Sequence, residues 1–202
     1  MVRNPSPVMN ALFRRLNAKI GQSCDISPFC SLENVIIGNN VSIRDGVQLK
    51  NVTIDRDTKI GRSVTLYSSE AERPIRIGRS CRIMYGVFGE ATGGEIRIGD
   101  FGVVAHYTTI LTSSGPGAQS PIMGVLFPTK TGSVFVGTHS WIGAHCLLLP
   151  GVSLEEGVII GANSFLPEKK YEAWSVYGGS PAKLIKKIDG QQVDAARQIF
   201  RD

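Results

Sequence analysis

The sequence predicts an all-β fold in which the chain winds into a solenoid. The main observation is a six-residue repeat, clearest between residues 136 and 166, where every sixth residue is aliphatic: Val136, Ile142, Leu148, Leu154, Ile160 and Leu166. The residue four places after each of the first five is small or valine. Because this period matches neither a helix nor an alternating strand, each unit is expected to form one short strand and one corner. Three units then close one triangular coil, with the aliphatic side chains inside.

Length and composition agree with one domain that has a sizeable core. The chain has 202 residues, of which 42% are hydrophobic, and a net charge of +5. No run of Lys and Arg is longer than two residues, which argues against a nucleic-acid surface and suits a small polyanionic ligand at least as well. The N-terminus has no long apolar run, so we expect no signal peptide, no membrane span and a cytoplasmic location.

The four cysteines follow the repeat. Cys24, Cys30, Cys81 and Cys146 each stand four residues after an isoleucine, at the inward small position. We therefore expect core thiols, not a disulfide framework or a zinc site, and we expect no metal.

The first 19 residues differ from the rest of the chain. Val8, Leu12 and Leu16 share one side of a helical pattern. This spacing predicts a short amphipathic helix over residues 1–19 that caps the open end of the solenoid.

The repeat itself begins at Ile20 and defines a β-solenoid domain over residues 20–171. Seven residues open the first face of successive coils, which predicts about seven coils: Ile20, Ile37, Ile54, Ile77, Ile98, Val136 and Leu154. Extra or missing residues fall on the third face of each coil. The larger of two interruptions, 112–133, is rich in Gly, Ser, Pro and Thr and is expected to be a loop. Its apolar run, 122–127, predicts packing against a neighbouring subunit or a ligand.

The repeat stops after Leu166, and residues 172–202 form a separate C-terminal segment. A strand is expected over residues 174–177, followed by a Gly-Gly turn and a basic tail. Residues 191–201 are expected to form a final short helix.

The repeat, the segment WIGAHCLLLPGVSLEEGVIIGANSF and the ending GGSPAKLI together resemble the hexapeptide-repeat acyltransferases of the sugar O- and N-acetyltransferase type. The resemblance covers about residues 20–188. It implies a left-handed parallel β-helix and a homotrimer with sites between neighbouring columns. It also implies acetyl transfer from acetyl-CoA to a hydroxyl or amino group of a sugar, in surface-polysaccharide biosynthesis.

The resemblance also implies where acetyl-CoA binds. The pantetheine arm should follow the corners of the IGA segments, and the tail should meet the adenine and phosphate end. The matching residues are Trp141, Gly143, Ala144, Gly161, Ala162, Ser180, Lys183 and Lys186. For the lysines, a solvated face is the alternative.

Acyl transfer needs a base for the acceptor and a donor for the oxyanion. In many relatives the base is a histidine in the loop after the strand equivalent to 108–111, but residues 112–133 contain none. Only His106, His139 and His145 are available. The resemblance favours His139, two residues before Trp141, with His106 second. Glu90, in the shorter interruption, could orient a base or bind a sugar hydroxyl.

Two other interpretations stay open. A γ-type carbonic anhydrase has the same fold and binds zinc through three histidines, but consecutive corners of one coil face different directions. A non-catalytic trimeric binding protein is suggested by the missing loop histidine. The sequence leaves open the acceptor, the choice of O- or N-transfer, and the length of the acyl group.

Overall fold

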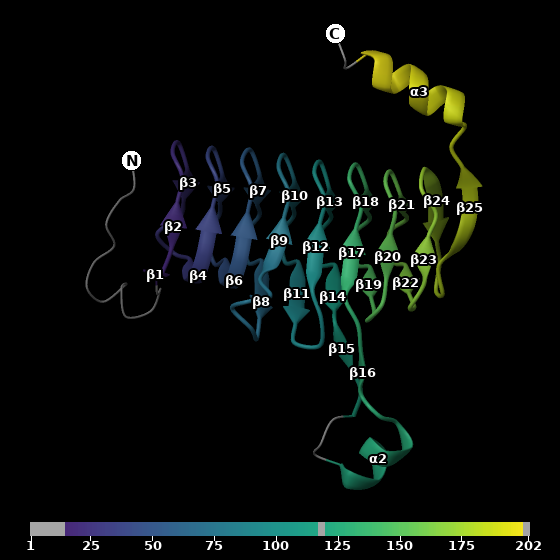
Figure 1. The fold of residues 1–202 in the computed structure, drawn as a ribbon, viewed down its shortest axis with the longest axis horizontal. Helices are drawn as coiled ribbons and strands as arrows, with labels where there is room; N and C mark the ends of the chain where they lie inside the picture. The colour runs from purple at the N-terminus through teal and green to yellow at the C-terminus, as the bar shows by residue number, and fades with distance from the viewer. Residues whose placement is uncertain (1–14, 117–119, 200–202) are drawn as a thin grey trace.

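In the part of the chain that the structure describes, short parallel strands stack into a column, and two short helices lie at its periphery (Figure 1). A computed structural model describes residues 15–116 and 120–199. This curled parallel arrangement is consistent with a β-helix.

Two large sheets form the column. The 14-stranded sheet contains β1 (Arg15–Leu16), β2 (Lys19–Ile20), β4 (Ser31–Ile37), β6 (Gln48–Ile54), β8 (Thr65–Ser68), β9 (Ile75–Ile77), β11 (Phe88–Ala91), β12 (Ile96–Ile98), β14 (Thr109–Leu111), β17 (Val134–Val136), β19 (Leu147–Leu148), β20 (Ser153–Leu154), β22 (Phe165–Leu166) and β23 (Lys170–Tyr171). The nine-stranded sheet contains β3 (Asp25–Ile26), β5 (Ser42–Ile43), β7 (Lys59–Ile60), β10 (Arg82–Ile83), β13 (Val103–Val104), β18 (Trp141–Ile142), β21 (Ile159–Ile160), β24 (Ser175–Gly178) and β25 (Lys183–Lys187).

The strand register confirms the six-residue pattern. Direct pairing links all seven predicted first-face residues in order and then adds Tyr171: Ile20, Ile37, Ile54, Ile77, Ile98, Val136, Leu154 and Tyr171. All of these except Ile20 are buried. Each of these buried positions places one side chain in the interior, and its neighbours in the strand face outward.

The interior thiols also agree with the sequence. Cys30, Cys81 and Cys146 are buried, Cys24 is half-buried, and all four are free. Burial raises the pKa of the Cys81 thiol to about 11 and also raises that of Cys146. Neither of these two thiols is ionised near neutral pH, so neither is an activated nucleophile.

The expected N-terminal helix is wrong over its last residues. Residues 1–14 lie outside the described part of the chain. Arg15–Leu16 and Lys19–Ile20 form β1 and β2, which both pair with β4. The backbone of β1 and β2 forms hydrogen bonds with the edge of β4, and this strand pairing outweighs the weak helical pattern of the sequence.

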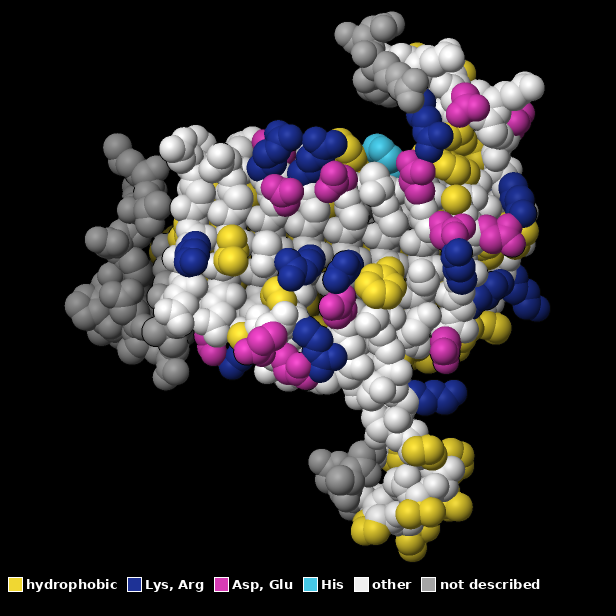
Figure 2. Space-filling model, viewed as in Figure 1, with side chains coloured by type: hydrophobic (Ala, Val, Ile, Leu, Met, Phe, Trp, Pro, Cys, Tyr) yellow, Lys and Arg dark blue, Asp and Glu magenta, His cyan; other side chains and the backbone are white. Residues whose placement is uncertain are grey.

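The large insertion projects away from the column (Figure 1). Its stem is an antiparallel pair, β15 (Ser113–Ser114) and β16 (Lys130–Thr131), and its tip carries helix α2 (Pro121–Leu126). The sequence predicts only a loop, so α2 is a correction. Proline starts α2, and the Ser120 hydroxyl caps it by accepting from the backbone N–H of Met123. Figure 2 shows hydrophobic side chains gathered on this tip.

The C-terminal segment folds back along the column. β24 and β25 pair antiparallel, and helix α3 (Gly190–Ile199) follows, close to the predicted 191–201. Arg197 of α3 pairs with Glu156 at 2.9 Å and lies over the ring of Trp174. Among the helices in the described ranges, none is long and apolar enough to cross a membrane.

Candidate functional site

Two rows of turns join the large sheets, and they carry most of the predicted site residues. The first row leads from the 14-stranded to the nine-stranded sheet and includes the turns at Phe101, His139 and Trp174. The second row leads back and includes the turns at His106 and Ala144. The structure therefore places the two favoured histidines on different rows.

His139 is exposed, and its ring lies beside other aromatic rings. It stacks on Phe101, with ring centroids 4.8 Å apart and planes 5° apart, and its centroid lies 6.4 Å from that of Trp174. The ring of Trp174 occupies the space above Gly157, where any side chain would collide with it. Arg79 and Arg197 lie over the outer rings. Both faces of the His139 imidazole thus have packing partners.

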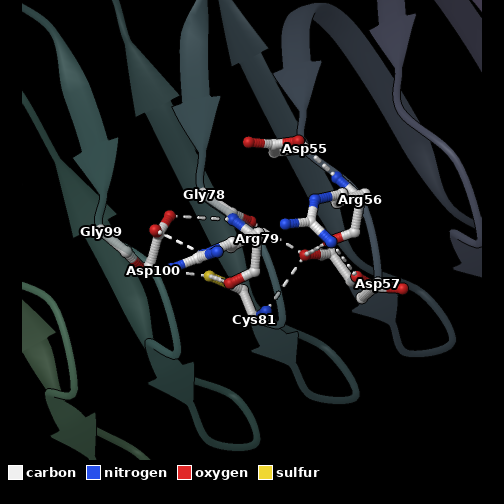
Figure 3. A network of polar contacts seen from close by, with 9 residues as sticks. Asp55, Arg56, Asp57, Gly78, Arg79, Cys81, Gly99 and Asp100 are labelled. Carbon is white, nitrogen blue, oxygen red and sulfur yellow. Dashed lines mark hydrogen bonds and ion pairs between the residues drawn. The ribbon is translucent and has the colours of Figure 1, made fainter. Parts of the chain in front are cut away.

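Polar contacts reinforce the first row (Figure 3). The Asp100 carboxylate accepts from the backbone N–H of Arg79 at 3.0 Å and from its Nε at 2.9 Å. The Cys81 thiol lies 3.1 Å from the carbonyl oxygen of Gly99. These contacts join one turn to the next and give the first row a structural role.

His106 lies in a different setting. It is exposed and lines one end of a pocket of about 260 Å³, whose other lining residues include Lys59, Arg82 and Tyr85. Its backbone carbonyl accepts from the N–H of His145 at 2.9 Å, and the carbonyl of Ala144 accepts from Asn163 in the same way. His106, Ala144 and Ala162 therefore occupy equivalent places in successive turns of the second row.

The other histidine of the second row is a packing residue. The ring of His145 stacks on Tyr107 at 5.1 Å, and Tyr107 meets Tyr85 edge-on at 5.0 Å. His145 and Tyr107 have positive φ angles, which turn these side chains along the row.

The predicted cofactor glycines are not equivalent. A Cβ built on Gly143 would lie 2.5 Å from the backbone nitrogen of Ala162, so contact between turns already requires glycine there. A Cβ on Gly161 would lie 3.6 Å from the Tyr177 carbonyl, which is an ordinary contact. Free space along this row is therefore found at Gly161 and the exposed Ala162.

The remaining predicted cofactor residues lie beside this row. Direct pairing on the nine-stranded sheet connects Trp141 to Ile159, Ile159 to Val176, and Val176 to Lys186. Trp141 is 43% exposed, and Lys186 is exposed. Lys183 and Ser180 are exposed at the same end of the sheet. An apolar strip thus leads to a basic end.

Glu90 stabilises the base of the insertion. Its carboxylate accepts from the backbone N–H groups of Thr112 and Ser113 at 3.2 and 3.1 Å, and from the Thr92 hydroxyl at 2.7 Å. Burial raises the pKa of the adjacent Tyr67, and the Glu90 charge raises it further. These contacts hold Glu90 in place and use much of its hydrogen-bonding capacity.

Within a single chain, the histidines of the zinc alternative do not come together. Within the described residues, no three His, Cys, Asp or Glu side chains are grouped as metal ligands. His139 lies on one row of turns and His106 and His145 on the other.

Sequence reasoning missed the cations of the pocket. Lys59 and Arg82 immediately precede the inward Ile60 and Ile83, so the alternation places them outward. Only the strand register brings Lys59 and Arg82 together, because they lie 23 residues apart in the sequence.

The chain is similar to acyltransferases over short segments, and in fold over most of its length. No family model matches. The chloramphenicol acetyltransferase of Klebsiella aerogenes is 40% identical over 58 residues, which are 29% of this chain and 27% of that protein. The match spans less than a third of the length of the curated relatives.

Two solved structures share the fold. A mutant of AntD, an N-acyltransferase from Bacillus cereus in complex with dTDP and coenzyme A, aligns with a TM-score of 0.53 at 23% identity, covering 98% of this chain and 96% of AntD. The polySia-specific acetyltransferase NeuO aligns with a TM-score of 0.56 at 18% identity, covering 91% and 95%.

Proposed function

We propose that the protein is an acyl-CoA-dependent acyltransferase that moves an acetyl group from acetyl-CoA to a hydroxyl or amino group of a sugar. The observation that carries the proposal is the line of His106, Ala144 and Ala162 beside the strip from Trp141 to Lys186. A thioester at His106 would have its pantetheine arm along the small residues and its phosphates near the lysines.

The comparisons support the proposal. The short matches fall on proteins named acetyltransferases, and AntD was solved with coenzyme A. A maltose O-acetyltransferase from Clostridium difficile also shares the fold, with a TM-score of 0.52. The proposal includes a left-handed β-helix of about seven coils, as in the hexapeptide-repeat family, with domain boundaries at residues 19 and 171. It also includes a cytoplasmic role in surface-polysaccharide synthesis.

In the proposed step, His106 acts as the general base. The acceptor oxygen or nitrogen attacks the thioester carbonyl while the imidazole takes its proton. The tetrahedral intermediate collapses, the C–S bond breaks, and the proton passes to the sulfur to give free coenzyme A. No covalent enzyme intermediate is required, in agreement with the raised pKa values of the Cys81 and Cys146 thiols.

His106 replaces His139 as the favoured base for a geometric reason. A general base must reach the acceptor within hydrogen-bond distance, and His106 borders a pocket. His139 is packed between Phe101 and Trp174, on the other row of turns.

The proposal includes a homotrimer. The projecting tip exposes 58–82% of the surface of Ile122, Val125, Leu126 and Phe127, more apolar surface than a free loop normally shows. In the proposed trimer, a neighbouring column covers this tip. Light scattering tests this directly: a monomer at micromolar concentration contradicts the trimer.

The activity is tested by release of coenzyme A thiol from acetyl-CoA in the presence of a panel of sugars. We expect acceptor-dependent release that falls sharply in the variant His106→Asn. If acetyl-CoA binds but no sugar releases thiol, the non-catalytic interpretation holds. If acetyl-CoA does not bind at all, the acyltransferase proposal is wrong.

A further inference from the structure

We propose that the pocket beside His106 binds a phosphate group of the acceptor, so that the substrate is a phosphorylated sugar and not a neutral one. This inference rests on the proposed function, because it assigns the acceptor end of the same site. It starts from an uncompensated pair of cations.

Lys59 and Arg82 are directly paired on neighbouring strands, and both are exposed. Like charges placed directly opposite each other destabilise a sheet. Neither side chain forms an ion pair with a carboxylate in the part of the chain that the structure describes. Arg44 lines the same pocket and forms an ion pair with the exposed Asp25 at 3.0 Å, a pair that water screens. An anion placed between these cations would remove the repulsion.

A second pair of cations differs because carboxylates line the same hollow and one of the two cations forms an ion pair. Arg76 and Arg97 are also directly paired, on the 14-stranded sheet, where they line a larger hollow of about 600 Å³. That hollow contains Asp55 and Asp100, and Arg97 pairs with Glu95 at 2.8 Å. Lys and Arg lie beside Asp and Glu on the face drawn in Figure 2. No Asp or Glu is among the described residues lining the pocket beside His106.

The geometry fits a hexose carrying one phosphate. Arg82 pairs with Val103, three residues before His106, so Lys59 and Arg82 lie one to two strand spacings from that turn. Together with the three residues along the strand, this gives a backbone separation of roughly 10–15 Å, which a hexose phosphate and the long Lys59 and Arg82 side chains can span. Tyr85, 40% exposed, forms an aromatic wall between the two ends.

Phosphate suits these cations better than carboxylate. A phosphate ester carries a charge of about −1.5 to −2 at neutral pH, and its oxygens accept from several donors at once. The Arg82 guanidinium provides a planar fork for two of these oxygens, and Lys59 adds a point charge.

Calorimetric titration of the full chain with inorganic pyrophosphate tests the binding without relying on catalysis. We expect the double variant Lys59→Gln/Arg82→Gln to weaken binding at least tenfold. The matched control, Arg76→Gln/Arg97→Gln, removes the same charge from the other sheet and should bind as the wild type does. Equal affinities in all three proteins, or loss only in the control, would overturn the proposal.

Transfer assays then identify the chemistry of the acceptor. Each hexose is offered in neutral form, as the uronic acid and as the 1-phosphate, and we expect the phosphate to give the highest kcat/KM. The Lys59→Gln/Arg82→Gln variant should lose this preference while its KM for acetyl-CoA stays unchanged. A preference for the uronic acid, or a raised KM for acetyl-CoA, would contradict the proposal. Absence of transfer to every acceptor would count against the enzyme activity, whereas the pyrophosphate titration would still report on the pocket.

Discussion

The two rows of turns have closely related backbones but differ in what surrounds their histidines. Both His139 and His145 have positive φ angles and rings stacked on a neighbouring aromatic side chain. His106, one residue before such a position, is the histidine that borders a pocket. Rings stack in both rows, but in the second row the small Ala144 and Ala162 take the place of His106 in the next two turns. Under the proposed function, the pocket beside its turn, and not the residue type, distinguishes His106 from the other two histidines.

The same substitution on both rows gives the largest expected contrast. His106→Asn should lower kcat/KM by roughly 10²–10⁴-fold because it removes the general base. His139→Asn should retain the wild-type kcat/KM, because asparagine tolerates the positive φ and the ring there only packs. Steady-state kinetics at matched protein stability measures both. A larger loss of kcat/KM in His139→Asn than in His106→Asn would show that His139, and not His106, is the base.

The two glycines of the second row separate packing from ligand binding. Gly143→Ala should cost about 2–3 kcal/mol of stability, because its Cβ would meet the backbone nitrogen of Ala162 at 2.5 Å. Gly161→Ala should leave the free energy of unfolding nearly unchanged and raise the KM for acetyl-CoA. Urea denaturation together with kinetics measures both effects. If Gly161→Ala leaves that KM unchanged, the proposed cofactor path is incorrect.

A pair of tryptophans provides the next contrast. Trp174→Asn should cost about 1–2 kcal/mol, because it removes a ring packed over Gly157 and beneath Arg197. Its activity per folded molecule should be preserved. Trp141→Ala should instead raise the KM for acetyl-CoA with little change in Tm, since the ring is 43% exposed. If Trp174→Asn instead raised the KM for acetyl-CoA and Trp141→Ala instead lowered the stability, the roles proposed for the two tryptophans would be wrong.

The smallest effect concerns pH. The hydrogen bond from Lys170 lowers the pKa of Glu155 below its usual value near 4.5, and the backbone N–H of Ala173 lowers it further. A lowered pKa in the folded state contributes stability above the unfolded value, and this stability is lost as pH falls through the folded value. Glu155→Gln should therefore have a lower Tm than wild type at pH 7, and the difference should vanish in strong acid. A constant difference down to that range would contradict this linkage.

The sequence predicts the fold better than the site. Interior residues such as Ile77 and Val136 follow from a repeat, because each coil must present an aliphatic side chain at the same place. Helix α2 is missed because it has only six residues and depends on a cap at Ser120, not on any periodicity. The pairing of Lys59 with Arg82 depends on register across coils of unequal length. Similarly, nothing in the local sequence around His139 reveals that Trp174 packs above Gly157.

The ladder of parallel strands has a consequence for how this protein can change. Strand pairing joins each coil to the coil before and the coil after it, so the effect of a substitution stays within about one turn in each direction. The turns near Lys59 and Arg82 can therefore vary without disturbing those at Ala144 and Ala162. In such a column, the residues proposed to select the acceptor can change in one coil while the residues proposed to bind acetyl-CoA, in another coil, stay the same.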